Sequence, residues 1–236
     1  MKLEIEVHSV QVNILTRLLF QPQATFSQLN EDNIATDNFS FHLRRLQELG
    51  LVEKHSTGKY QLTAIGKEFA NRIDTDTNKV EKLAKPSVLV VVVKKTPGGP
   101  TEYLIQQRLK QPFYGYHGCL TGKIHWGESV LEAAARELLE ETGLKATLSL
   151  KGVWHKLDKT AEGRLLEDKF FYIVRADNPQ GDVKAAFEGG TNNWMTAEAF
   201  HKVKNMFRDA EKPLAIAEDK QLSFQEAVYE YDSSEY

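Results

Sequence analysis

The chain has 236 residues, of which 41% are hydrophobic and 27% charged, and its formal net charge at pH 7 is −3. This composition is typical of a globular protein with one large domain or two small ones. The mild acidity gives no overall attraction to nucleic acid or to membranes, and no apolar run reaches the length of a membrane span. Cys119 is the sole cysteine and the N-terminus lacks a signal-peptide core, so we expect a cytoplasmic protein with no membrane partner.

The first 74 residues predict a small helical unit with one hairpin. Its segments have the spacing of regular elements: helices over residues 7–20, 25–33, 37–49 and 64–73, and two short strands within 51–63. Thr25 and Thr36 are expected as N-caps, and the third helix is expected to end at Gly50. Ser56, Thr57 and Gly58 supply the turn of the hairpin.

This order of elements resembles the winged helix-turn-helix domain of bacterial and archaeal transcription regulators. In that domain the third helix is the recognition helix, which meets the major groove of DNA. Phe39, Leu43 and Leu46 would then form its buried stripe. The candidate DNA contacts that the resemblance implies, on this helix and on the wing, are Asn38, Phe41, His42, Arg44, Arg45 and Lys59.

The balance of charged residues does not decide whether this unit binds DNA or a protein. Residues 1–85 carry 11 Lys and Arg against 11 Asp and Glu, whereas duplex binding draws most of its affinity from neutralising phosphates. Winged helices also serve as dimerisation and protein-binding modules. Phe41 suits a thymine methyl group or a protein partner equally well. Duplex DNA and a second copy of the chain, giving a homodimer, both remain candidate partners.

The segment between the two halves, residues 75–85, is polar and contains no Gly or Ser. Such a linker is not expected to be a freely flexible tether, and the helix over residues 64–73 is expected to run on into it. The predicted organisation is therefore a winged-helix domain, a linker, a second domain and an acidic, mobile tail. Their bounds are 1–74, 75–85, 86–226 and 227–236.

The second domain predicts an α/β fold. Residues 87–95 read as a buried strand, and residues 102–109 as its hairpin partner across the turn Thr96–Pro100. Further strands are expected over residues 148–158 and 169–177. A helix is expected to start at Ala197 and to continue to Phe207.

Residues 122–144, GKIHWGESVLEAAARELLEETGL, carry the strongest pattern in the chain. Gly122 is followed after five residues by Glu128, and after seven more by Arg136 and the acidic cluster. Ser129 with Glu132 predicts a capping box at a helix start, and Gly143 predicts the helix end. The apolar positions at helical spacing, which predict the core face, are Leu131, Ala135, Leu138 and Leu139.

Glu137, Glu140 and Glu141 are expected together on the opposite, solvent-facing side of this helix. Three like charges at i, i+3 and i+4 destabilise a helix, which suggests a ligand. Carboxylate oxygens suit Mg²⁺ or Mn²⁺, which also keep positions for water and substrate phosphates. The alternative is a solvated acidic face. The exact spacing, the capping box and the glycines favour the metal.

The string resembles the signature box of the Nudix (MutT-like) hydrolases at every specified position. Over about residues 85–224 the resemblance implies an α/β/α sandwich with a mixed sheet. It implies metal-dependent hydrolysis of a nucleoside diphosphate linked to another group. It assigns Mg²⁺ or Mn²⁺ binding to Glu137, Glu140 and Glu141, gives Arg136 the role of orienting them, and lets Glu128 brace the loop before the helix.

The resemblance also suggests residues outside the helix. The Thr121 carbonyl is a candidate metal ligand, although many relatives have Gly there, and Gly122, Lys123 and Arg108 are candidate phosphate contacts. Glu188 is the candidate base or additional ligand. The aromatic residues that flank the site, and that would stack on a base or pack in the core, are Tyr114, Tyr116 and Trp126. His117 and His125 lack partners at zinc spacing, and Cys119 is expected to be a small buried side chain.

Two interpretations of the whole protein follow. The first is an active Nudix pyrophosphatase whose winged helix dimerises or tethers it. The second is a transcription regulator that senses a nucleotide such as ADP-ribose. Nudix-type repressors usually carry the winged helix after the Nudix domain and often have eroded boxes, so the intact box and the opposite order favour the enzyme. Nucleoside triphosphates, ADP-ribose, dinucleotides and nucleotide sugars all remain candidate substrates.

Overall fold

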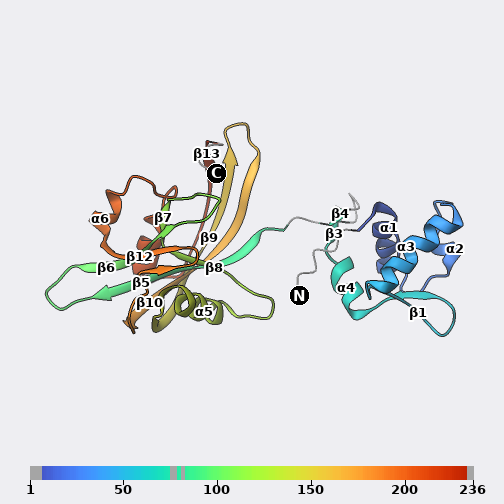
Figure 1. Ribbon diagram of the computed structural model, residues 1–236, viewed down its shortest axis with the longest axis horizontal. Coiled ribbons are helices and arrows are strands. Elements are labelled where there is room, and N and C mark those ends of the chain that lie inside the picture. Colours follow the sequence, from blue (N-terminus) through green and yellow to red (C-terminus); the bar gives the residue numbers. More distant parts are fainter. Residues whose placement is uncertain (1–6, 75–78, 81–82, 233–236) are drawn as a thin grey trace. The chain divides into compact units, whose positions relative to one another are not determined.

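A computed structural model of the chain describes residues 7–74, 79–80 and 83–232. The chain divides into two compact units, Met1–Lys82 and Leu83–Tyr236. Figure 1 shows the elements of each unit in sequence colours. The two units are described separately below.

The described part of the first unit contains four helices and two antiparallel strand pairs, one before the last helix and a further pair after it. Up to the last helix, its elements are α1 (Ser9–Phe20), α2 (Phe26–Leu29), α3 (Thr36–Glu48), β1 (Val52–Lys54), β2 (Tyr60–Leu62) and α4 (Ala64–Ala70). Thr25 caps α2 through a capping box with Gln28, as predicted. The predicted cap at Thr36 is wrong: the N-cap of α3 is Ala35, which forms no side-chain cap, and Thr36 is already the first helical residue.

The core of the first unit gathers the predicted stripes of α1 and α3. Ile14 and Leu15 of α1 and Phe39 and Leu46 of α3 are at most 2% exposed. His42 was expected on the outer face of α3, and this expectation is wrong, because the side chain is only 7% exposed. Its ring stacks on the His8 ring at 4.5 Å between centroids. Burial first, and the neighbouring His8 second, lower the pKa of His42.

The predicted continuation of α4 into the linker is also wrong. The helix ends at Ala70, and β3 (Ile73–Asp74) pairs antiparallel with β4 (Lys79–Val80). Ile73 is 6% exposed and belongs to the core of the first unit, so its burial draws the chain out of the helical path. Residues 75–78 and 81–82 of the predicted linker lie outside the described residues.

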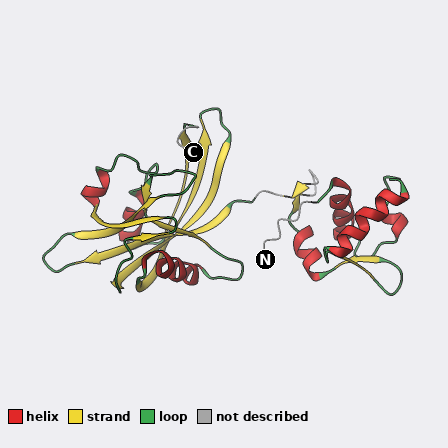
Figure 2. Ribbon diagram, viewed as in Figure 1, coloured by secondary structure: helices red, strands yellow, loops and turns green. Residues whose placement is uncertain are grey.

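Within the described part of the second unit, nine strands form one mixed sheet, which Figure 2 shows in yellow. The main path runs β11-β12-β6-β5-β10-β9-β13, with β7 beside β6 and β8 beside β5. The pairs β5–β10 and β9–β13 are parallel and the other pairs are antiparallel. The strand bounds are β5 (Lys85–Lys95), β6 (Thr101–Arg108), β7 (His117–Gly118), β8 (Leu120–Lys123), β9 (Lys145–Thr160), β10 (Leu165–Gln180), β11 (Ala186–Phe187), β12 (Gly190–Thr196) and β13 (Ser223–Tyr231).

Helices cover both faces of this sheet. On one face, α5 (Val130–Thr142) packs on Val88, Val90 and Val92 of β5. On the other, α6 (Ala197–His201) and α7 (Lys212–Glu218) share a core with the alternate residues of the same strand, among them Val91. A strand covered on both sides reads as a continuous apolar run, which explains the valine-rich sequence of β5. Among the described residues, no helix is long and apolar enough to cross a bilayer.

Two expectations for the C-terminal part are wrong. The helix that starts at Ala197 ends at His201 rather than near Phe207. Residues 227–231 do not belong to a mobile tail, because they complete β13 beside β9. The physical reason is alternation: Tyr229 and Tyr231 point into aromatic clusters, and Tyr231 is 1% exposed. The last four residues of the predicted tail lie outside the described residues.

Candidate active site

Helix α5 begins and ends at the residues that its sequence predicts. The Ser129 hydroxyl accepts from the Glu132 amide at 3.4 Å, and the Glu132 carboxylate accepts from the Ser129 amide at 2.9 Å. At the other end, Gly143 adopts φ +76° and its amide donates to the Leu139 carbonyl at 3.0 Å. A left-handed residue at this position strongly favours glycine. The two signals therefore fix the length of the helix that carries the acidic cluster.

The faces of α5 differ from the prediction. Ala133 and Ala134 are fully buried, whereas Leu131 and Leu139 are 43% and 44% exposed. Small side chains let the helix backbone approach the sheet closely, so the alanines rather than these leucines form the contact. Ala135 is exposed as well, and only Leu138 of the predicted core face is buried.

The three acidic residues of α5 differ in how exposed their side chains are. The Glu137 side chain is only 12% exposed, while the Glu140 side chain is 59% exposed. Glu141 is half-buried. The prediction that all three carboxylates lie on a solvent-facing side is therefore wrong for Glu137 and Glu141, which border the sheet.

Gly122 of β8 leaves room for Glu137. A Cβ atom at position 122 would collide with the Glu137 carboxyl group. Glycine is the residue that permits such a close approach of side chain to backbone. The position of the Glu137 carboxyl group therefore depends on the absence of a side chain at Gly122.

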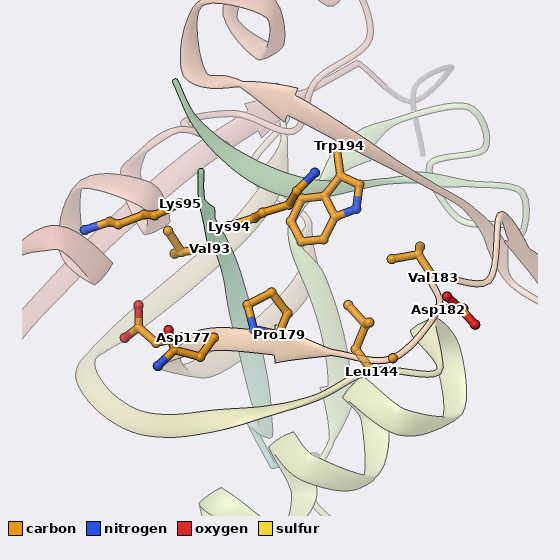
Figure 3. A pocket seen from close by; sticks show the side chains of 11 residues that line it. Val93, Lys94, Lys95, Leu144, Asp177, Pro179, Asp182, Val183 and Trp194 are labelled. Carbon is orange, nitrogen blue, oxygen red and sulfur yellow. The ribbon is translucent and has the colours of Figure 1, made fainter. Parts of the chain in front are cut away.

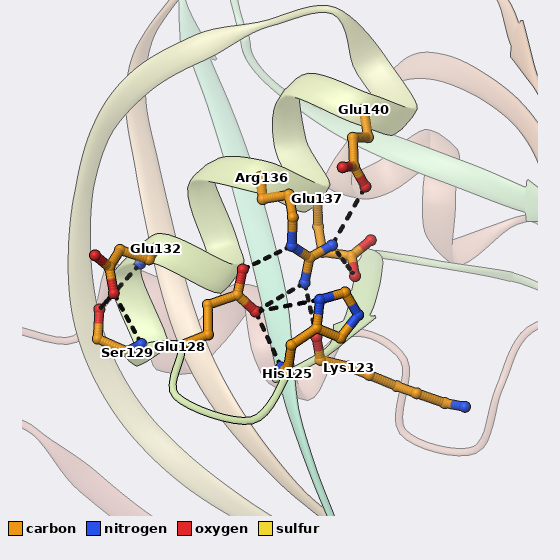
Figure 4. Close-up of polar contacts among 8 residues, drawn as sticks. All are labelled: Lys123, His125, Glu128, Ser129, Glu132, Arg136, Glu137 and Glu140. Carbon is orange, nitrogen blue, oxygen red and sulfur yellow. Dashed lines mark hydrogen bonds and ion pairs between the residues drawn. The ribbon is translucent and has the colours of Figure 1, made fainter. Parts of the chain in front are cut away.

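Arg136 is the centre of a polar network (Figure 4). Its Nε and Nη2 atoms donate to the two oxygens of Glu128 at 2.6 and 3.0 Å, a bidentate pair. Its Nη1 donates to Glu137 at 2.8 Å and to Glu140 at 3.2 Å. Nη2 also reaches the Lys123 carbonyl at 2.9 Å. One guanidinium therefore joins two carboxylates of the cluster to β8 and to the loop before the helix.

Glu128 ties that loop to the middle of α5. Besides its pair with Arg136, its carboxylate accepts from the His125 amide at 3.0 Å. These hydrogen bonds, that of Arg136 foremost, lower the pKa of Glu128 to about 2. The carboxylate thus stays ionised over the whole range in which the protein would work.

The pKa of Glu141 is shifted in the opposite direction. Burial, and secondarily the charge of Glu137, raise the pKa of Glu141, against the lowering effect of a hydrogen bond from Gln106 and of the cations Lys110 and Arg108. A partly buried carboxylate that is disfavoured as an anion is stabilised by a neighbouring cation. Carboxylate oxygens are hard ligands, so Glu141 offers the type of donor that a divalent metal prefers.

The carboxylates of α5 are not drawn together around one point. Among the described residues, no three His, Cys, Asp or Glu side chains form a group that could hold a metal ion. The reason is visible in the hydrogen bonds: Arg136 holds Glu137 and Glu140, and Gln106 holds Glu141 at 3.0 Å.

Arg108, predicted to contact phosphates, lies at the end of β6. Its Nε and Nη2 atoms donate to the carbonyl oxygens of Pro112 and Gln111 at 2.6 and 3.1 Å. The guanidinium therefore holds the loop after β6. Burial lowers the pKa of Arg108, while the charges of Glu167 and Glu141 raise it. It thus lies within electrostatic reach of the acidic cluster.

Three further residues predicted for the site, Thr121, Lys123 and Glu188, are exposed. Thr121 is exposed on β8, opposite Leu89 of β5. Lys123 is exposed too, and Figure 4 shows its side chain extending away from Arg136. Glu188 is exposed in the turn between β11 and β12, where the next strand begins by pairing Gly190 with Arg108.

The aromatic residues near the box differ in exposure. Trp126, in the loop before α5, is 91% exposed, and Tyr114 is 59% exposed. Tyr116 packs on Phe113 and Phe207 with ring centroids 5.5 Å apart, so it belongs to the core. Cys119 is buried as predicted, and burial raises the pKa of its thiol to about 12.

Sequence reasoning missed two buried amides next to the cluster, Gln106 of β6 and Asn192 of β12. Both are at least nine-tenths buried. The signal was present in the strand TEYLIQQR, where alternation places Gln106 on the same face as Leu104, which packs under α5. A polar residue at an inward position is unusual and calls for a partner.

A hollow of about 520 Å³ lies beyond the C-terminal end of α5. Figure 3 shows Trp194 on one side of it and Leu144 and Pro179 on the other. Lys94 and Lys95 add positive charge to its lining, and Asp177 and Asp182 add negative charge. The carboxylates of the box do not line it, so it is separate from the site of Figure 4.

Comparison with known proteins agrees with this geometry. Residues 84–215 match the NUDIX domain family. Among solved structures, a MutT protein from Bacillus halodurans covers 64% of this chain and 93% of its own, with a TM-score of 0.52 and 20% identity. The NUDIX domain of Shewanella oneidensis NrtR, solved with ADP ribose, covers 66% and 97%, with a TM-score of 0.51 and 18% identity. At these low sequence identities, the two solved structures show a shared fold and no more.

Two relatives are more similar in sequence. An ADP-ribose pyrophosphatase of Methanocaldococcus jannaschii is 30% identical over 119 residues, which are 49% of this chain and 68% of that protein. An octanoyltransferase of Myxococcus xanthus is 30% identical over 135 residues, 56% of this chain. The chain spans only 36% of the length of that second relative.

The fold and the box define a Nudix-type hydrolase domain. The chain belongs to the NUDIX domain family. Together with the pyrophosphatase relative, this membership supports a Nudix pyrophosphohydrolase.

Proposed function

We propose that the chain hydrolyses the pyrophosphate bond of a nucleoside diphosphate linked to another group, with Mg²⁺ or Mn²⁺ as cofactor. The observation that carries the proposal is the network of Figure 4, in which Arg136 joins Glu128, Glu137 and Glu140 beside the half-buried Glu141. A purely solvated acidic face would need neither the bidentate pair of Arg136 with Glu128 nor the steric match of Glu137 with Gly122.

The metal ligands in this proposal are Glu137, Glu140 and Glu141, with the Thr121 carbonyl as an additional oxygen. These residues would hold a metal that, when bound, would supply charge neutralisation for the phosphates and a lowered pKa for the attacking water. Arg136 holds two of the carboxylates before the metal binds, and Glu128 holds Arg136. The helix thus presents its ligands on a framework that is fixed in advance.

Substrate phosphates would be bound at the cationic side of the site. The charge of Glu141 raises the pKa of Arg108, and the Lys123 carbonyl accepts a hydrogen bond from Arg136 of the box helix, with Gly122 beside it. Glu188 lies in the turn beside the end of β6 and is the candidate general base or extra ligand. Trp126, exposed in the loop that Glu128 holds, is available to stack on a base.

ADP-ribose is the first substrate to test. The Methanocaldococcus jannaschii relative is an ADP-ribose pyrophosphatase, and the fold neighbour from Shewanella oneidensis was solved with ADP ribose. In ADP-ribose, two phosphates join a nucleoside to a second group, as in the class of substrate proposed here.

We propose a winged helix-turn-helix role for the first unit, as a dimerisation module or a DNA-binding domain. The candidate contacts that remain exposed are Asn38, Phe41, Arg44, Arg45 and Lys59. Phe41 is 61% exposed, which favours a partner on this face of α3. Under a second candidate function, a nucleotide-sensing regulator, these residues would contact duplex DNA, and affinity would fall steeply with added salt.

The test of the enzymatic proposal is a hydrolysis screen. ADP-ribose, nucleoside triphosphates, dinucleotides and nucleotide sugars are each incubated with the full chain in Mg²⁺, in Mn²⁺ and in EDTA. We expect release of a nucleoside monophosphate or of pyrophosphate from at least one compound, abolished by EDTA. Turnover that persists in EDTA would overturn the metal-dependent mechanism. A gel shift on random duplexes, with and without ADP-ribose, separates the regulator from the enzyme.

A further inference from the structure

Two buried amides lie behind the last glutamate of the box. Gln106 Nε2 donates to Glu141 Oε2 at 3.0 Å and to Asn192 Oδ1 at 3.1 Å. Asn192 Nδ2 donates to the carbonyl oxygens of Glu141 and Lys184 at 2.9 and 2.8 Å. The two amides and the Glu141 carboxylate form one chain of hydrogen bonds that runs from β12 through β6 to α5.

We infer that Asn192 and Gln106 are positioning residues, which hold the Glu141 carboxylate in the orientation that a divalent metal requires. The inference rests on the proposed function and adds to it a second layer of residues. It concerns a different carboxylate from those that Arg136 holds.

The orientation of each amide is dictated by its neighbours. Backbone carbonyl oxygens only accept hydrogen bonds, so the side of Asn192 that faces two of them must be its NH₂ group. The Asn192 side-chain oxygen then faces Gln106, so the Gln106 group that donates to it must be its NH₂ group. Both hydrogens of Gln106 Nε2 are thereby committed, one to Asn192 and one to Glu141. Reversing either amide would set oxygens against oxygens.

The arrangement leaves one oxygen of Glu141 available. Gln106 engages Oε2, and among the described residues no hydrogen bond is formed by Oε1. A carboxylate fixed through one oxygen, with the other unengaged, suits a monodentate ligand of Mg²⁺ or Mn²⁺. Residues that hydrogen-bond to metal ligands typically change metal affinity by about 10–100-fold when they are replaced.

Burial explains why these residues are amides. Gln106 is 9% and Asn192 is 6% exposed. A charged donor at position 106 would add a positive charge beside Glu141 and so compete with the metal for this carboxylate. A neutral amide orients the carboxylate while leaving its charge uncompensated.

The experiment measures Mn²⁺ binding to the full chain by electron paramagnetic resonance, in the absence of substrate. Gln106→Met keeps the length of the side chain and removes its donor. Gln107→Leu, on the neighbouring half-buried position of the same strand, is the matched control. We expect Mn²⁺ affinity to fall about tenfold in the first variant and to stay at the wild-type value in the second. Circular dichroism and thermal unfolding confirm that both variants fold.

A double-mutant cycle with Asn192→Leu tests the connection between the amides. If Asn192 acts through Gln106, its replacement weakens Mn²⁺ binding in the wild type but much less in the Gln106→Met background. Additive losses would overturn the connection, and wild-type Mn²⁺ affinity in Gln106→Met would overturn the inference as a whole. If Asn192→Leu does not fold, the single variants at positions 106 and 107 decide.

The proposed function has a separate readout in the same assay. Glu140→Gln should weaken Mn²⁺ binding whether or not the amides matter. A wild-type chain that binds no Mn²⁺ would overturn the proposed function together with the inference. Weakened binding in Glu140→Gln with unchanged binding in Gln106→Met would overturn the inference alone.

Discussion

Glu141 and Glu128 show how two carboxylates of one motif are set to different tasks. Arg136 and the His125 amide lower the pKa of Glu128, whereas burial beside Glu137 raises the pKa of Glu141. The first group is neutralised by the protein. For the second, burial outweighs the nearby cations Lys110 and Arg108, so the ionised form of Glu141 is disfavoured in the folded chain.

Replacing Glu141 should therefore stabilise the metal-free protein. Because the folded-state pKa of Glu141 is raised, its contribution to stability is fully present below the ordinary value of 4.5 and is lost as the pH rises through the folded pKa. In EDTA at neutral pH, Glu141→Gln should melt a few degrees higher than the wild type, and the difference should vanish below pH 4.5. Mg²⁺ should raise the melting temperature of the wild type more than that of the variant. A variant less stable than the wild type in EDTA would contradict this explanation.

Gly122 offers a steric prediction at the same scale. In Gly122→Ala the new methyl group would displace the Glu137 carboxyl group. A displacement of about 1 Å at a catalytic group can reduce turnover by about a hundredfold, and we expect a loss of that order in kcat. The control is Gly99→Ala in the turn before β6, where the new methyl group meets only ordinary contacts. Equal activity in the two variants would show that Glu137 need not lie over β8.

For single residues, the sequence was most informative where local hydrogen bonds and backbone angles fix the spacing. The capping residues Ser129 and Gly143 follow from it directly. The faces of α5 did not, because a stripe of Leu131 and Leu139 is more apolar than Ala133 and Ala134. Close packing of small residues on a sheet depends on the partner surface, which is distant in sequence. The inward orientation of Gln106 was hidden for the same reason.

Among the elements, β13 differs most from what its sequence predicted. Its acidic, polar appearance predicted a mobile tail, yet Tyr231 is buried beside Phe113 at 4.8 Å between ring centroids. Lys156 of β9 donates to the Tyr231 hydroxyl at 3.0 Å and pairs with Asp158 at 3.0 Å. Burial lowers the pKa of this lysine. Alternation along β13 hides its tyrosines and exposes its glutamates, which a simple count of polar residues overlooks.

Tyr231→Ala should consequently destabilise the second unit. Removing a large buried aromatic side chain typically lowers the free energy of unfolding by about 3–5 kcal/mol. Val228→Ala, on the exposed face of the same strand, should change it by less than about 0.5 kcal/mol. Urea unfolding followed by circular dichroism measures both. Comparable values for the two variants would restore the view of residues 227–231 as a mobile tail.

The elements of the central sheet were easier to predict than its order. The runs that became β5, β6, β9 and β10 are strongly apolar or alternating, so their existence and type follow from periodicity. Strand order and the parallel pairing of β5 with β10 depend on long-range contacts that no local pattern encodes. The brevity of α6 and the pairing of β3 with β4 belong to the same class.

At the scale of the molecule, each unit has its own core. The first gathers residues from Val12 to Ile73, and the clusters of the second lie between Val88 and Tyr231. The described carboxylates and amides of the proposed site all belong to the second unit. The change in composition around residues 75–85 indicated two halves, but α4 ends at Ala70 instead of running on toward this segment as predicted.

Residues 83–236 should therefore fold and hydrolyse substrate without the first unit. We expect the truncated chain to retain cooperative thermal unfolding and a kcat within about twofold of the full chain. Size-exclusion chromatography of both forms tests the dimerisation proposed for the first unit. A folded truncated chain that has lost activity would instead show that the first unit contributes to the site.

The central claim is that the carboxylates of α5 hold the divalent metal of a pyrophosphohydrolase. It is tested most directly by comparing two glutamates of that one helix in the full chain. Glu137→Gln removes a proposed ligand, and Glu132→Gln makes the same change of charge while preserving the capping box, which accepts Gln as well as Glu. The measurement is kcat for ADP-ribose, or for the best compound of the screen, at saturating Mg²⁺. The predicted result is a loss of orders of magnitude in Glu137→Gln and wild-type turnover in Glu132→Gln. Equal rates in the two variants would contradict the claim.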